Sequence, residues 1–161
     1  CGFFCVAYCS GWEGDIEDML DMLVREKPSL MARVFPKWLG RGTSDYDLDV
    51  MLNALGFETP AVKIGAALFD RILERTVLTP GRLQNVLDSH RVIYSVRLDK
   101  RSGRLSRSGI LHWVVIEDVV PNEFGGVVDV YNPFGNKREG YEWEQVVESG
   151  GVPYGVVVPR R

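Results

Sequence analysis

The first half of the chain carries apolar residues at helical spacing. Residues 1–12 are apolar on nearly every side, which predicts a helix buried in a core. Residues 15–25 place apolar side chains at a period of 3.6, with acidic residues at the front and Arg25 at the back, as the helix dipole favours. A short helix is expected from Pro28 to Val34, because Pro36 then interrupts the pattern.

Three further helices are predicted in the middle of the chain. Gly42-Thr43-Ser44 precedes a helical stripe that ends at Gly56, and Thr or Ser in this place can cap the first turn. Residues 66–75 show the same period. Thr79-Pro80 starts another helix, which His90-Arg91 closes. The first half of the molecule is therefore expected to be helical.

From residue 92 onward the period changes to two or to continuous β-branched runs, which predicts strands. The four predicted strands are residues 92–98, 111–120, 127–130 and 154–158. Short connections rich in Gly or Ser join the first three, so these should pair as an antiparallel meander. One more helix, residues 141–149, separates the last strand from the others. A helical first half and a stranded second half make an α+β fold rather than a doubly wound one.

Composition limits the function classes. The chain has 161 residues, 45% of them hydrophobic and 25% charged, which suits one globular domain spanning residues 1–161. The formal charge of -3 gives no overall attraction to nucleic acid, so no nucleic-acid partner is expected. The longest apolar run, around residues 113–116, is far shorter than the roughly 18 residues that span a bilayer. We therefore expect no membrane insertion.

The three cysteines all lie within the first nine residues, at intervals of four. A helix points residues at this spacing along one side instead of pairing them, so we expect reduced thiols and a cytoplasmic location. A zinc site built from Cys1, Cys5, Cys9 and His112 is disfavoured. Successive steps of four residues climb about 12 Å along a helix and cannot converge on one tetrahedral ion. No metal and no cofactor are expected.

Cys1, His112 and Asn132 are the candidate catalytic residues. Cys1 would sit at the start of the first helix, where the dipole favours a thiolate. His112 lies in a predicted strand and can serve as a base, while Asn132-Pro133 at the end of the next strand can hold the imidazole in one tautomer. Gly2 is expected to let a substrate carbonyl approach the backbone beside the thiol. For the only other histidine, His90, a structural role at the end of its predicted helix is favoured over a catalytic role.

These motifs resemble those of the papain-like cysteine peptidases, and particularly the bacteriocin double-glycine leader peptidases and their relatives. Cys1-Gly2-Phe3-Phe4-Cys5 is similar to the start of their active-site helix, and His112-Trp113-Val114-Val115 and Asn132-Pro133 follow in the family's order. The resemblance runs from residue 1 to about residue 158. It implies a papain-like fold in which the helix that bears the nucleophile packs on a C-terminal antiparallel sheet.

The resemblance also implies the activity. Cys1 would attack a peptide bond, His112 would act as acid and base, and Asn132 would orient His112, in cleavage of a leader peptide or of the protein's own precursor. Many relatives have an Asp where this chain has Asn132. Relatives also carry a Gln a few residues before the nucleophile that helps to form the oxyanion hole, and no residue precedes Cys1 in this sequence. We therefore expect an upstream segment, or other domains of the same precursor, as a partner besides the peptide or protein substrate.

Two other functions stay open on the sequence alone. The domain could be a catalytically degenerate relative that binds a partner or peptide, since the Gln of the oxyanion hole is not in the sequence. It could instead be an N-terminal-nucleophile amidohydrolase, with the α-amine of Cys1 as base, although the apolar helix after Cys1 argues against this. The basic loop from Lys100 to Arg107 is expected to be a solvated hairpin tip, with a substrate-selecting rim as its alternative.

Overall fold

The computed structural model describes residues 1–32, 42–57, 72–74 and 79–161. Its described helices are α1 (Gly2–Ser10), α2 (Ile16–Glu26), α3 (Pro28–Met31), α5 (Asp45–Ala54), α7 (Pro80–Leu87) and α8 (Trp143–Glu148). Its described strands are β1 (Ile72–Glu74), β2 (His90–Leu98), β3 (Ile110–Val120), β4 (Val127–Asn132), β5 (Lys137–Glu142) and β6 (Gly150–Pro159). The α+β class predicted from the sequence is confirmed.

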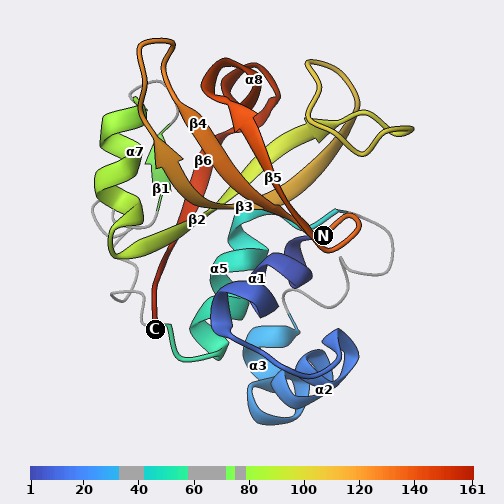
Figure 1. Cartoon of the computed structure of the whole chain (residues 1–161). Helices are drawn as coiled ribbons and strands as arrows, with labels where there is room; N and C mark the ends of the chain where they lie inside the picture. The colour runs from blue at the N-terminus through green and yellow to red at the C-terminus, as the bar shows by residue number, and fades with distance from the viewer. Residues whose placement is uncertain (33–41, 58–71, 75–78) are drawn as a thin grey trace.

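The strands form one antiparallel sheet in the order β1-β6-β2-β3-β4-β5 (Figure 1). The predicted meander of β2, β3 and β4 is confirmed. The last strand, β6, returns to pair with β2 on the opposite side from β3. This arrangement leaves β3, which carries His112, in the interior of the sheet with a neighbour on each side.

Each face of the sheet is covered by a different set of helices. Alternate residues of one strand point to opposite faces, so Ile93 joins the cluster with α1, α2 and α5, while Tyr94 joins the cluster with α7 and α8. Trp113 and Val114 divide in the same way on β3. Because both faces are covered, the middle strands are continuous apolar runs, as is typical of strands buried on both sides. Figure 1 shows α1, α2, α3 and α5 grouped beside one face.

Four local predictions differ from the structure. The helix expected to close at His90-Arg91 ends at Leu87, and residues 90 and 91 already belong to β2. The helix expected over residues 66–75 is wrong for residues 72–74, which form β1. The other residues of this range lie outside the described part of the chain. β5 was not predicted, because its only buried side chain is Tyr141 and the strand lies at the sheet edge. The helix expected over residues 141–149 therefore begins only at Trp143. The short helix expected to reach Val34 ends at Met31, and residues 33 and 34 are not described.

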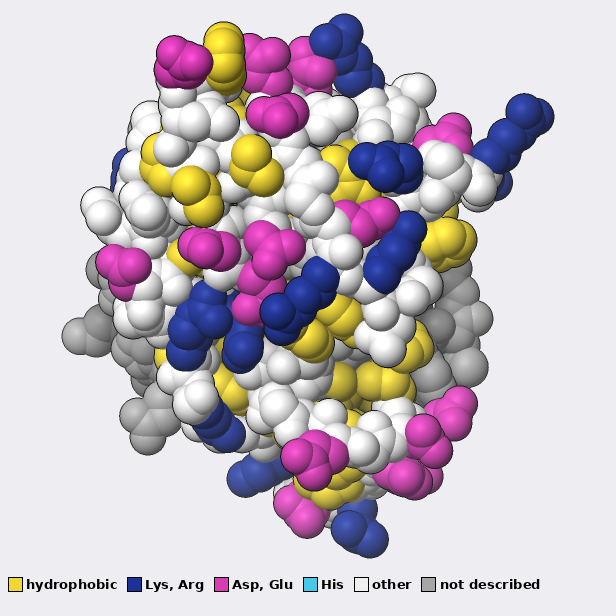
Figure 2. Space-filling model, viewed as in Figure 1, with side chains coloured by type: hydrophobic (Ala, Val, Ile, Leu, Met, Phe, Trp, Pro, Cys, Tyr) yellow, Lys and Arg dark blue, Asp and Glu magenta, His cyan; other side chains and the backbone are white. Residues whose placement is uncertain are grey.

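The surface carries charges of both signs. Figure 2 shows Lys and Arg side chains interspersed with Asp and Glu across the face viewed in Figure 1. This mixture accords with the small formal charge of -3. Within the described segments, none of the helices combines the length and the apolar character needed to cross a bilayer.

Candidate active site

The Cys1 thiol lies where the first helix meets the sheet. Cys1 is the N-cap of α1 and is exposed to solvent. Its Sγ accepts a hydrogen bond from the backbone N–H of Trp113 on β3, at 3.4 Å. The helix N-terminus and this N–H group both present partial positive charge to sulfur, and both favour a thiolate over a thiol.

Gly2 leaves room for the side chain of Thr43. A Cβ atom on Gly2 would lie 2.7 Å from Cβ of Thr43, closer than any ordinary contact. The backbone carbonyl of Thr43 in turn accepts a hydrogen bond from the indole Nε1 of Trp113, at 2.7 Å. Thr43 therefore packs against the first turn of α1 and is held there by Trp113. The glycine is required by this packing, and its expected role in admitting a substrate carbonyl stays a prediction.

His112 is placed by strand pairing. It lies opposite Val96 of β2 and is buried, with 8% of its surface exposed. Its Nε2 lies 3.0 Å from Oδ1 of Asn132, which ends β4. Burial lowers the pKa of His112 from 6.5 to about 4. The hydrogen bond to Asn132 raises this pKa, but its effect is smaller than that of burial. The imidazole is thus neutral near neutral pH, and burial disfavours its protonated form.

The partners of Asn132 decide which nitrogen of His112 carries the proton. Oδ1 of Asn132 accepts the backbone N–H of Phe134 at 2.9 Å, and Nδ2 donates to the carbonyl of Gly103 at 3.2 Å and to Oε2 of Glu139 at 3.3 Å. These contacts fix the orientation of the carboxamide, because a backbone N–H can only donate and a carbonyl can only accept. Nε2 of His112 must therefore donate to Oδ1. In the neutral ring, Nδ1 is left as the basic atom.

Cys1 and His112 share one hollow in the surface, with a volume of about 320 Å³. Its walls come from segments far apart in the sequence: Cys1, Gly42, Thr43, Ser44, Asp45, Ser95, Leu111, His112 and Trp113. In the described part of the chain no hydrogen bond joins Sγ of Cys1 to the imidazole; the thiol instead contacts the amide that follows His112. The structure thus brings His112 and Asn132 into direct contact and Cys1 beside them.

Cys5 and Cys9 are buried in the core. Burial raises the pKa of the Cys5 thiol well above its usual value, and burial likewise raises that of Cys9 to about 12. Sγ of Cys5 donates a hydrogen bond to the carbonyl of Trp113, so the two thiols of Cys1 and Cys5 contact the two ends of the same residue's backbone. Both buried thiols therefore stay protonated near neutral pH.

The sequence did not indicate two residues that contact Asn132. Gly103 lies in the basic loop that was expected to be a solvated tip, yet it is buried and contributes its carbonyl to the site. Its φ of +68° favours glycine, and the ring of Phe134 occupies the space that a side chain would need. The pair Ser102-Gly103 was the feature of the loop sequence that could have indicated a special backbone conformation here. Glu139 lies on the unpredicted strand β5, and nothing in its local sequence distinguished it.

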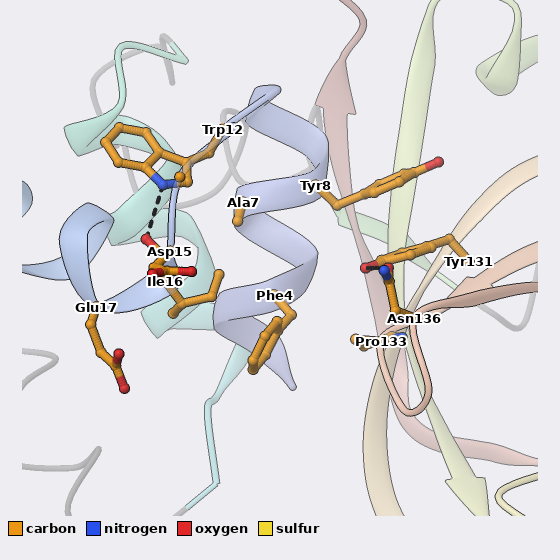
Figure 3. A pocket seen from close by; sticks show the side chains of 11 residues that line it. Phe4, Ala7, Tyr8, Trp12, Asp15, Ile16, Glu17, Tyr131, Pro133 and Asn136 are labelled. Carbon is orange, nitrogen blue, oxygen red and sulfur yellow. Dashed lines mark hydrogen bonds between the residues drawn. The ribbon is translucent and has the colours of Figure 1, made fainter.

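A second hollow, of about 560 Å³, lies along α1 and beside the β4–β5 turn. Figure 3 shows Phe4 and Tyr8 on α1 on one side of Pro133 and Tyr131, and the rings of Tyr8 and Tyr131 are stacked with centroids 3.8 Å apart. Phe4 follows Cys1 by one helical turn. The aromatic lining offers a place for an apolar side chain close to the candidate site.

Comparison with known proteins gives no relative from which to transfer a function: no model of a protein family matches this chain, and no curated protein or solved structure does. Within the described residues, the His, Cys, Asp and Glu side chains form no group of three or more that could hold a metal ion. The chemistry of the site therefore depends on Cys1, His112, Asn132 and the groups around them.

Proposed function

We propose that this protein is a cysteine peptidase that hydrolyses a peptide bond with Cys1, His112 and Asn132. The observation that carries the proposal is the hydrogen bond from His112 to an Asn132 whose orientation is fixed, because it leaves Nδ1 as a base. The position of Cys1 at the start of α1, beside the amide of Trp113, supports its role as the nucleophile.

The reaction would proceed through a thioester. The Cys1 proton passes to Nδ1 of His112, and the thiolate attacks the substrate carbonyl carbon to form a tetrahedral oxyanion. The imidazolium then donates its proton to the leaving amine as the C–N bond breaks. Water, deprotonated by His112, attacks the thioester and releases the carboxylic acid and the free thiol. Asn132 keeps the ring in one orientation and stabilises its charged form throughout.

Alkylation by iodoacetamide tests the nucleophile. At pH 6 we expect Cys1 to react about tenfold faster than N-acetylcysteine, because the site stabilises the thiolate, while Cys5 and Cys9 remain unlabelled under native conditions. His112→Ala should remove the excess reactivity without unmasking the buried thiols. Peptide mapping by mass spectrometry measures each rate. A Cys1 that reacts no faster than the free thiol in the intact protein would overturn the assignment.

A non-catalytic peptide-binding domain is the second candidate. It is favoured by one observation, that the thiol of Cys1 contacts a backbone amide and not the imidazole. On this account a peptide would bind in the hollow without being cleaved, and binding would survive in Cys1→Ser and His112→Ala variants. The N-terminal-nucleophile mechanism is disfavoured because α1 begins at Gly2, whereas those enzymes place their nucleophile on a strand. Full activity of His112→Ala would revive it.

A further inference from the structure

Asn132 lies between an imidazole and a carboxylate. On one side Oδ1 lies 3.0 Å from Nε2 of His112, and on the other side Nδ2 donates to Oε2 of Glu139 at 3.3 Å. The three side chains come from β3, β4 and β5, three neighbouring strands of the sheet. The carboxamide therefore links His112 to a negative charge through two hydrogen bonds in series.

The Glu139 carboxylate is built into this position by other partners. Only 12% of its side chain is exposed, Tyr141 donates to Oε2 at 2.7 Å, and Nζ of Lys137 lies 2.8 Å from Oε1. Burial alone would raise the pKa of Glu139, but the hydrogen bonds from Lys137, Tyr141 and Asn132 outweigh it and lower the pKa. Glu139 is thus charged at neutral pH and held close to the amide.

We propose that Glu139 is a positioning residue that supplies, through Asn132, the negative charge that stabilises the protonated form of His112. This inference rests on the proposed function. It explains how Asn132 can serve in the place where many papain-like peptidases that the sequence resembles have an Asp. A carboxylate that accepts from Nδ2 polarises the amide and makes Oδ1 a stronger acceptor for the proton on Nε2. The charge lies one hydrogen bond further from the ring than an Asp would place it.

Other charged and titratable groups also face this unit. Cys1 and Asp45 line the hollow with His112, Lys137 pairs with Glu139, and Arg104 lies over the ring of Tyr141 with 5.3 Å between its Cζ and the ring centroid. All of these groups are retained when only Glu139 is changed. A substitution at Glu139 removes its charge and, with it, the ion pair to Lys137.

Glu139→Gln is the informative variant, because it keeps an acceptor oxygen for Nδ2 and removes the charge. We expect iodoacetamide to alkylate Cys1 about tenfold more slowly at pH 7, equivalent to one pKa unit of the imidazole. At pH 10 the thiol ionises without help from His112, so the rates of the variant and the wild-type protein should converge. Glu123→Gln, in the exposed turn between β3 and β4, is the matched control and should leave the rates unchanged.

In a protein that carries Asn132→Asp, the effect of Glu139→Gln on the alkylation rate of Cys1 should change sign. Asn132→Asp alone sets two carboxylates against each other and should react slowly, whereas the added Glu139→Gln should speed it up again, since one charge then lies directly on the imidazole. A Glu139→Gln substitution that slows both backgrounds equally, or neither, would overturn the inference.

The proton spectrum of Asn132 separates this inference from the proposed function. If Glu139 binds the carboxamide, the Nδ2 proton of Asn132 that points to Glu139 exchanges slowly in the wild-type protein and in Glu139→Gln, and more quickly in Glu139→Ala. The Nδ2 proton donated to the carbonyl of Gly103 serves as the internal reference. This readout needs no reactive thiol. Slow exchange together with an inert Cys1 would leave the Asn132–Glu139 link intact and defeat the peptidase assignment, and fast exchange in the wild-type protein would defeat the link itself.

Discussion

Asn132 is the residue on which the geometry of the candidate site depends most. Its side chain contacts His112, Gly103, Glu139 and the amide of Phe134, and only 1% of its surface is exposed. The sequence predicted its role from its place after a strand. The sequence could not predict its partners Gly103 and Glu139, because they come from a loop and an edge strand that meet only in the folded sheet.

Replacing Asn132 should therefore affect rate and stability together. We expect Asn132→Ala to slow peptide hydrolysis on the order of 100-fold, because the imidazole loses its fixed tautomer. The free energy of unfolding should fall by about 1–3 kcal/mol, since the carbonyl of Gly103 and the carboxylate of Glu139 lose a donor. Steady-state kinetics and urea unfolding measure the two effects.

Asn122 provides a matched control for this substitution. Its Oδ1 accepts the backbone N–H of Phe124 at 2.8 Å, in the same local geometry that joins Asn132 to Phe134. Asn122→Ala removes that local bond at the exposed turn before β4, whereas Asn132 ends β4. An equal loss of activity in the two variants would mean that Asn132 acts only through its turn.

At the scale of the element, the contact of α1 with the segment before α5 holds Cys1 in place. A Gly→Ala substitution inside a helix usually stabilises it by about 0.5–1 kcal/mol. At Gly2 the added Cβ would meet Thr43, so we expect Gly2→Ala to destabilise the protein by about 1–3 kcal/mol and to slow alkylation of Cys1. Gly81→Ala in α7, where nothing lies within 4 Å, should show the usual stabilisation.

Thr43→Gly should rescue part of the loss in Gly2→Ala, because the atom nearest to the new Cβ is Cβ of Thr43. A double-mutant cycle in urea unfolding gives the coupling between the two positions. If Gly2→Ala stabilises the protein as much as Gly81→Ala does, then Thr43 does not pack on α1 as described.

The elements themselves were predictable where periodicity was strong. α2 and α5 show a helical period, and the buried strands β2 and β3 are continuous apolar runs. Ser44, one of the two caps that the sequence offered, caps α5 through a reciprocal pair of hydrogen bonds with Asp47. β1 and β5 lie at the two edges of the sheet, and β5 buries only one side chain. Apolar periodicity carries little information about such strands, and pairing to a neighbour determines them instead.

At the scale of the whole molecule, folding gathers the site from both halves of the chain. Cys1 and Thr43 come from the helical half, and His112 and Asn132 from the sheet. The change of period at residue 92 was enough to predict this α+β division. The distance between thiol and imidazole depends on how α1 packs against β3, and local sequence does not encode that.

Burial of His112 makes global stability depend on pH. Its pKa is about 4 in the folded protein and about 6.5 when unfolded, so the unfolded state binds more protons between these values. Stability from this residue is present above pH 6.5 and is lost as the pH falls towards 4. Between pH 7 and pH 4.5 the free energy of unfolding of the wild-type protein should fall by about 1–2 kcal/mol more than that of His112→Gln, after allowance for partial solvent screening. Urea unfolding at the two pH values measures this difference. Equal losses in the variant and the wild-type protein would contradict the burial of a neutral imidazole.

Hydrolysis of a diverse peptide library in ¹⁸O-labelled water, with the new termini identified by mass spectrometry, tests the peptidase activity directly. The wild-type protein should produce carboxyl termini that carry ¹⁸O at a restricted set of sequences. Cys1→Ser and His112→Ala should produce none, and Cys9→Ala, if it remains folded, should match the wild-type protein. Cleavage that persists in Cys1→Ser, or a wild-type protein that binds peptides and leaves every bond intact, would contradict the assignment of this molecule as a cysteine peptidase.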